Sequence, residues 1–154
     1  MNKMYFSILT VTVSLMSVFT TAGWIAAAPL KESNIHISQS VDEGKVSAAK
    51  ITVDSSNGGP EIVRMQADYP PDTVIQVEAS LTVKEGSYKV ELLNKGKASL
   101  VLAAKDGKVV KGKGKMSAIA NGDVEYRVTA KNAKKAYLEL ALKAVANTSQ
   151  AEKR

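Results

Sequence analysis

The densest group of side chains that could bind a ligand is a run of lysines in the second half of the chain. Its members are Lys105, Lys108, Lys111, Lys113 and Lys115. Alternate side chains of a β-strand point to the same face, so the last three would present their ammonium groups together. Such a strip could bind an anionic polymer or a layer of lipid headgroups, through contacts that salt weakens. The alternative is an edge strand whose lysines prevent pairing with another sheet.

Groups that could perform catalysis are few and scattered. Ser47 and Lys50 have the Ser-x-x-Lys spacing of one class of serine enzymes, but the Ser-Asp-Asn and Lys-Thr-Gly elements of those enzymes are absent from the sequence. An extracellular hydrolase could instead use carboxylates that folding brings together. The carboxylates considered for that alternative are Asp54, Glu61, Asp68 and Asp72. None of them has a diagnostic spacing, so we predict that the protein is not an enzyme.

Metal and cofactor sites are not expected from the composition. The chain has no cysteine and one histidine, His36, so neither a thiolate zinc site nor a disulfide framework is possible. We predict no cofactor. One aromatic residue, Tyr69, is followed by two prolines and is expected on a loop, where a sugar ring could stack on it.

The first 28 residues have the order of a secretory signal peptide. Lys3 and the α-amino group are positive, no charge follows up to Ala28, and three alanines precede Pro29. The uncharged stretch is also long enough to span a bilayer, so an uncleaved signal-anchor is the competing prediction. We therefore expect a secreted or extracytoplasmic protein, or one held by a single N-terminal membrane anchor; the cleavage site is left open.

The charge of the chain points to an anionic neighbour outside the cell. The chain has twenty-one Lys and Arg and fifteen Asp and Glu, which gives a net charge of +6. Loss of Lys3 with the leader would leave +5. An exported basic surface meets envelope polymers before it meets nucleic acid. We expect an anionic envelope polymer or a secreted or surface protein as partner, and no nucleic acid.

Hydrophobic residues alternate with polar ones from Ile35 onward, which is the pattern of strands with one buried face. The clearest case is 74–83, where Ile75, Val77, Ala79, Leu81 and Val83 share one face. Further strands are expected at 35–41, 45–53, 62–67, 88–92, 100–105, 108–116, 126–131 and 133–146. Residues 54–60 and 69–72 are expected to be loops.

Short turn sequences separate these expected strands. They are Glu85-Gly86, Asn94-Lys95-Gly96, Asp106-Gly107 and Asn121-Gly122. Asp106-Gly107 suits a type I′ turn and predicts a hairpin between 100–105 and 108–116. Together the pattern predicts an all-β domain over 34–146, an antiparallel β-sandwich of eight or nine short strands with jelly-roll or immunoglobulin-like topology. A flexible C-terminal tail is expected over 147–154.

These features favour an exported, non-catalytic β-sandwich that acts by binding or assembly at a bacterial cell envelope, with the lysine strip as a site for an anionic polymer. The alternative is a secreted protein-interaction module that uses its sheet edges. A hydrolase ranks behind both.

Overall fold

The fold consists of β-strands alone in the part of the chain that the structure describes. The computed structural model describes residues 5–9 and 28–145. Its strands are β1 (Tyr5–Leu9), β2 (Lys31–Asp42), β3 (Lys45–Met65), β4 (Val74–Asn94), β5 (Lys97–Lys105), β6 (Val110–Ser117) and β7 (Val124–Ala144). The all-β prediction is confirmed. Within the described ranges, no helix has the length and apolarity to cross a membrane.

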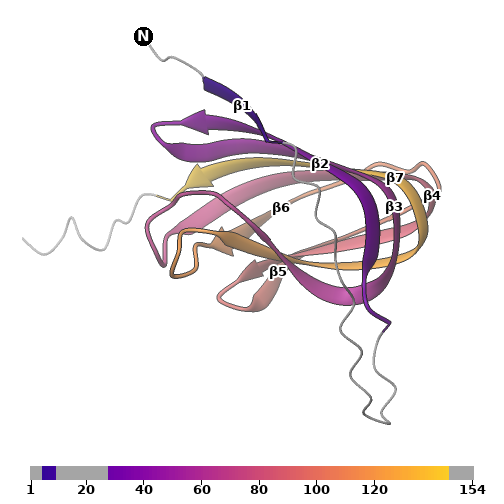
Figure 1. Cartoon of the computed structure of the whole chain (residues 1–154). Coiled ribbons are helices and arrows are strands. Elements are labelled where there is room, and N and C mark those ends of the chain that lie inside the picture. The colour runs from indigo at the N-terminus through magenta and orange to yellow at the C-terminus, as the bar shows by residue number, and fades with distance from the viewer. Residues whose placement is uncertain (1–4, 10–27, 146–154) are drawn as a thin grey trace, which may run out of the picture.

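All seven strands belong to one antiparallel sheet with the order β1-β2-β3-β7-β4-β5. The strand β6 also pairs with β4, so two strands share one side of β4. β6 pairs with the first part of β4, over 74–81, and β5 pairs with its last part, over 87–94. Figure 1 shows the resulting sheet curling around on itself.

The sheet curls because its three central strands bend at the same level. β3, β4 and β7 are each 21 residues long, and each has a register irregularity or left-handed residues near its middle. In β4 the bend is at Gly86, with φ +77°, and in β7 at Asn132, with φ +47°. In β3 it is at Gly58 and Gly59, where a Cβ would clash with the carbonyl oxygens of Pro29 and Val128. Glycine is required there because backbone approaches so closely.

The two halves of the bent sheet bury one aliphatic core between them. Alternate residues of 74–83 are buried as expected, and Tyr88 and Tyr126 join them on the inner face. On β6, Gly112 and Gly114 face inward, and a Cβ on either would meet the Leu100 side chain of β5. The lack of side chains at these two positions of β6 therefore lets β5 pack close to it.

The expected number and length of the strands are wrong. Residues 54–60, expected to be a loop, lie inside β3, and the expected turn at Glu85-Gly86 lies inside β4. In both places the glycines bend a strand that continues, where tight turns would have reversed it. The expected turns at 94–96 and 121–122 and the loop at 69–72 are confirmed.

The hairpin predicted around Asp106-Gly107 is also wrong. The turn forms, with φ of +45° and +83°, and the Lys108 N–H donates to the Lys105 carbonyl oxygen at 3.1 Å. However, the turn sits at the bend of β4, where the Gly107 N–H donates to Val83 O at 2.6 Å, and the two flanking strands pair with different halves of β4. Since one sheet links all the described strands, the structure does not confirm the jelly-roll or immunoglobulin-like sandwich.

The strand β1 comes from the segment predicted to be a signal peptide. It runs antiparallel to β2, with Tyr5 opposite Val41 and Leu9 opposite Ile37. The rest of that segment up to residue 27, and the predicted tail at 147–154, lie outside the described residues. Export and cleavage therefore stay predictions.

Candidate functional site

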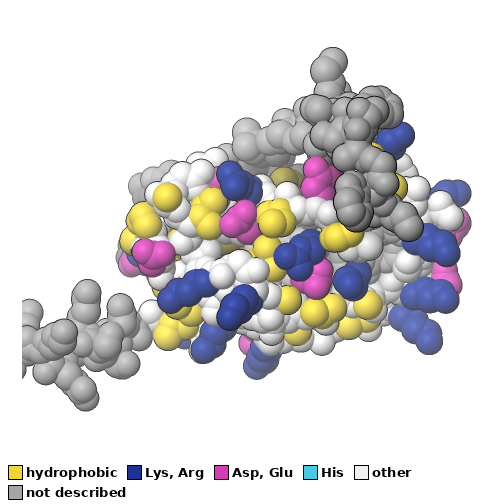
Figure 2. All heavy atoms as spheres, turned by 90° about the horizontal axis from the view of Figure 1, so that it is seen from below, with side chains coloured by type: hydrophobic (Ala, Val, Ile, Leu, Met, Phe, Trp, Pro, Cys, Tyr) yellow, Lys and Arg dark blue, Asp and Glu magenta, His cyan; other side chains and the backbone are white. Residues whose placement is uncertain are grey.

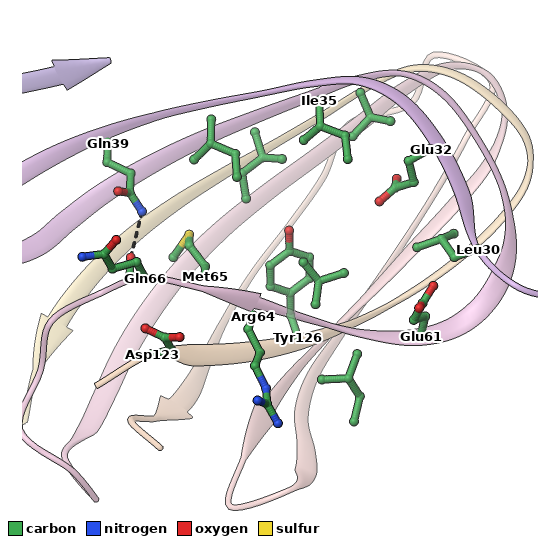
Figure 3. Close-up of a pocket in the computed structure, with 15 residues that line it drawn as sticks. Leu30, Glu32, Ile35, Gln39, Glu61, Arg64, Met65, Gln66, Asp123 and Tyr126 are labelled. Atoms are coloured by element: carbon green, nitrogen blue, oxygen red, sulfur yellow. Dashed lines mark hydrogen bonds between the residues drawn. The ribbon is translucent and has the colours of Figure 1, made fainter. Parts of the chain in front are cut away.

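A cleft opens between β2 and the second half of β3, where the two halves of the bent sheet come apart at one side. Its volume is about 430 Å³, which falls within the usual range for small-molecule sites. The walls are formed by β2, both halves of β3 and the start of β7. Figure 3 shows Tyr126 and Met65 in the middle of the cleft, with polar side chains at both ends.

The local backbone of β2 determines which of its side chains reach the cleft. Asn34 is left-handed, with φ +49°, and its side-chain amide donates to Asp54 at 2.9 Å. This residue interrupts the alternation, so that Glu32 and Ile35 both line the cleft despite their odd spacing. Beyond it Ile37 and Gln39 continue on the same face.

The body of the cleft is apolar. Aliphatic side chains and one thioether form it: Ile35, Ile37, Ile51, Val53, Val63 and Met65. Three of them, Ile51, Val53 and Met65, are also buried members of the core. A ligand in this cleft would therefore contact mainly hydrocarbon.

One end of the cleft is acidic. Glu32 and Glu61 lie there, near Leu30 (Figure 3). Glu32 accepts a 2.9 Å hydrogen bond from the Tyr88 hydroxyl. The Oε2 atom of Glu61 is buried and has no hydrogen-bond partner among the described residues. Buried acceptors without donors are uncommon in folded proteins.

Burial dominates the electrostatics of this end. It raises the pKa of Glu32; the hydrogen bond from Tyr88 opposes the rise and the nearby Glu61 adds to it. Burial, and then the charge of Glu32, also raise the pKa of the Tyr88 and Tyr126 hydroxyls. Both tyrosines therefore stay neutral, and an added positive charge or hydrogen-bond donor would relieve the cost of the carboxylates.

The raised pKa of Glu32 predicts a stability that falls with pH. The folded protein holds this proton to higher pH than the unfolded chain, whose value is near 4.5. The contribution of this proton to the free energy of unfolding is complete below that value and is lost as the pH rises through the folded pKa.

In Glu32→Gln the free energy of unfolding should fall less than in the wild type between pH 4.5 and about pH 7. Urea unfolding at both pH values measures the difference, with Glu43→Gln in the exposed β2–β3 turn as control. Equal changes in Glu32→Gln and wild type would contradict the assignment.

The other end of the cleft is polar but internally paired. The Gln39 side-chain amide donates to the Gln66 carbonyl oxygen at 2.8 Å, bridging β2 and the end of β3, as the dashed line in Figure 3 shows. Arg64 forms a 3.3 Å ion pair with Glu125. Asp123 lines the cleft as well. The charged side chains that line the cleft therefore carry a net negative charge, although the whole chain is basic.

The structure places the predicted lysine strip on the outer face of the sheet, away from the cleft. Lys111, Lys113 and Lys115 are exposed on β6, which has β4 as its hydrogen-bonded neighbour. Two lysines of neighbouring strands, Lys50 and Lys143, follow the same alternation and join them on this face. Lys105 ends β5, and Lys108 lies in the turn at the bend.

Acidic side chains interrupt this lysine face. Glu78 lies opposite Lys113 and forms a 3.1 Å ion pair with it, and Glu139 lies opposite Ser80, which itself faces Lys111. Figure 2 shows Lys and Arg mixed with Asp and Glu on the face of the molecule in view. The lysines are therefore part of a mixed surface with an excess of positive charge.

The expectation for Tyr69 is wrong. It lies on the loop before β4, but its ring is 5% exposed, and its hydroxyl donates to the Val46 carbonyl oxygen at 2.7 Å. The apolar ring packs in the core, and the hydroxyl, which needs an acceptor when it is buried, finds one there. A sugar could not stack on this residue.

The other candidates from the sequence are dispersed. Ser47 donates to the Ser40 carbonyl oxygen, and Lys50 points from the outer face. Asp54 is paired with Lys135 at 2.9 Å, and Asp68 accepts a hydrogen bond from Gln66.

Of the four carboxylates considered for a hydrolase, Glu61 lines the cleft. Its partner Glu32 was not identified from the sequence, because the left-handed residue that turns it inward leaves no clear signal. The described residues hold no cluster of three metal-ligating side chains.

Sequence comparison does not place the chain in a known family. No family model matches it, and no curated protein matches it either.

Several solved structures resemble the fold weakly. The xylan-binding domain CBM22-1 of Paenibacillus barcinonensis Xyn10C is 16% identical, with 82% of this chain and 88% of that chain covered and a TM-score of 0.38. A variant of a carbohydrate binding module of family 29 is 8% identical over 91% and 92%, with a TM-score of 0.39. The cupin domain of Drosophila melanogaster CENP-C is 14% identical over 74% and 75%, with a TM-score of 0.34. Scores and identities at this level assign the chain to no fold family and no function.

Proposed function

We propose that this is an exported, non-catalytic protein that acts by binding at the cell envelope, and that its cleft holds an aliphatic group ending in an ammonium. The observation that carries the proposal is the buried Oε2 atom of Glu61, which has no partner among the described residues at one end of an apolar cleft.

The shape and lining of the cleft favour an aliphatic ligand. Each methylene group that moves from water into such a cleft contributes about 0.8 kcal/mol. Half-buried Ile35 and Ile37 form the mouth, so a bound chain would also cover apolar surface of the protein. A sugar would find few hydrogen-bond partners along these walls.

The acidic end favours a cation. Burial raises the pKa of Glu32 in the free protein, and repulsion from Glu61 adds to the rise. An ammonium group would donate to Glu61 and reduce that repulsion. A ligand carboxylate would add a third negative charge at the same place. The site should therefore distinguish two ligands of equal length by the charge of the head group.

Octylammonium and octanoate test this proposal. Isothermal titration should show octylammonium binding at least about tenfold more tightly, which corresponds to about 1.4 kcal/mol. Glu61→Gln removes one charge with little change of shape and should lower the affinity for octylammonium. Glu78→Gln on the outer face, 68% exposed, is the matched control. Equal affinity for both probes, or equal loss in the two variants, would contradict the proposal.

Two neighbouring carboxylates also raise the question of glycoside hydrolysis, which uses such a pair. We favour binding because the Glu32 carboxylate is already engaged by the Tyr88 hydroxyl. Release of nitrophenol from nitrophenyl glycosides by the wild type, but not by Glu61→Gln, would replace this conclusion.

The lysine face supports a second candidate, the binding of an anionic envelope polymer. Five lysines lie on it against two carboxylates, and exposed charges on long, flexible side chains suit a flexible polyanion. Immobilised heparin serves as the probe. Changing Lys111, Lys113 and Lys115 to Gln should lower the salt concentration of elution more than the same change at Lys84, Lys95 and Lys97. If both triple variants lowered the salt concentration of elution equally, the retention on heparin would follow from net charge alone.

A further inference from the structure

The outer edge of β2 is the feature from which we draw a further inference. In the full chain β1 occupies this edge, over Ile37–Val41, and β1 belongs to the segment that we predict to be a signal peptide removed on export. We infer that, once the leader is gone, β2 of one copy pairs antiparallel with β2 of a second copy. The inference rests on the export proposed above and is independent of what the cleft binds.

The edge of β6 is guarded against strand addition, and the edge of β2 is not. The open side of β6 carries lysines, and Ser99 of β5 occupies its backbone groups at Lys115. The Lys115 N–H donates to the Ser99 hydroxyl at 2.9 Å, and the Lys115 carbonyl oxygen accepts from the same hydroxyl. In contrast, 35–41 contains no charged residue and no proline. Lysine and proline are the usual devices against strand addition.

The segment 35–41 is also complementary to itself. In an antiparallel pair centred near Ser38 and Gln39, residues that face the cleft in one copy would lie beside residues that face the cleft in the other. Ile35, Ile37 and Val41 are half-buried and pack against the core, so pairing would cover them. On the opposite face of the pair, Ser38 and Ser40 of the two copies would lie close together. No like charges of 35–41 would be opposite each other.

The place of β1 shows that the edge accepts an antiparallel neighbour. Its five residues follow β2 without a register irregularity, from Tyr5 opposite Val41 to Leu9 opposite Ile37. Seven paired residues would extend over about 23 Å. The leader would thus keep the chain monomeric until it is removed, and two copies would then form one continuous sheet with a two-fold axis.

Charge pairs at the edge test the inference. Ser38→Glu with Ser40→Glu, and Ser38→Lys with Ser40→Lys, place like charges opposite each other in either register of the symmetric pair. Sedimentation velocity on the cleaved protein should show a dimer for the wild type, monomers for each double variant, and a dimer again when the two variants are mixed. Ala48→Glu with Thr52→Glu, on the neighbouring strand and the same face, is the control and should stay dimeric. A monomeric wild type, or a dimer in both charge variants, would overturn the inference.

The uncleaved chain separates this inference from the proposal of export. The chain of residues 1–154 should be a monomer, and Ser7→Pro with Ile8→Pro, which prevents β1 from pairing, should convert it to a dimer. If exported protein keeps its leader but this variant dimerises, the predicted removal of the leader fails and the edge inference stands. If the variant stays monomeric, the edge inference fails whatever happens to the leader.

Discussion

Leu140→Ala is expected to lower the free energy of unfolding by about 3 to 5 kcal/mol. Leu140 has 0% exposure and lies in β7 between Ala49 of β3 and Ala79 of β4, with Gly112 of β6 next in the same row. Because its lateral neighbours are small, no flanking side chain could move in to fill the space. Since domains of this size are stable by only about 5 to 15 kcal/mol, the loss should be a large fraction of the total stability.

Urea unfolding followed by tyrosine fluorescence measures this effect. Lys143→Ala on the same strand is the control, because its exposed side chain should contribute within about 0.5 kcal/mol. A loss for Leu140→Ala below about 1 kcal/mol would mean that the halves of the sheet do not pack across this row.

Gly86→Ala is the second substitution with a large expected effect, because it tests the bend that brings the halves of the sheet together. Gly86 has φ +77°, and a Cβ there would lie 2.6 Å from the carbonyl oxygen of Lys131 and closer still to that of Asn132. Both oxygens belong to the backbone of β7 and cannot rotate away. The left-handed conformation should cost about 1 to 2 kcal/mol, and the clash about 1 to 3 kcal/mol more.

Gly96→Ala separates these two costs. Gly96 has the same φ of +77°, and a Cβ there would meet nothing within 4 Å. The unfolding free energy of Gly96→Ala should therefore fall by the conformational cost alone, and the difference between the variants reports the close approach of β4 and β7. Equal losses would contradict the bent geometry.

The strand content could be predicted from the sequence because each strand buries one face. Periods of two in 74–83 and 126–131 follow directly from this, and the buried residues are the expected ones. Some joins between strands could be predicted, such as the turn at 94–96, but the places where a strand bends and continues could not. A glycine such as Gly86 serves a turn or a bend equally well, and the choice depends on β7 lying alongside, which no local pattern encodes.

The cleft was beyond sequence reasoning for a similar reason. Its walls combine β2 and both halves of the bent β3 with the start of β7, which lies far along the chain. Glu32 enters it only because Asn34 is left-handed. Glu61 was among the carboxylates considered, but as one of four without any sign of which would be buried. The lysines of β6 were visible as a pattern, whereas the glutamates of β4 and β7 that lie among them depend on strand order.

Methyl NMR on the two described methionines tests the central claim, that the cleft between β2 and β3 is the binding site. Met65 lines the cleft, whereas Met116 is buried on β6 outside its lining, so one sample contains both reporter and control. With methyl-labelled methionine, octylammonium should shift the Met65 resonance in a saturable way, give contacts between that methyl group and the ligand chain, and leave Met116 unchanged. Saturable binding that shifts Met116 and leaves Met65 in place would contradict the account.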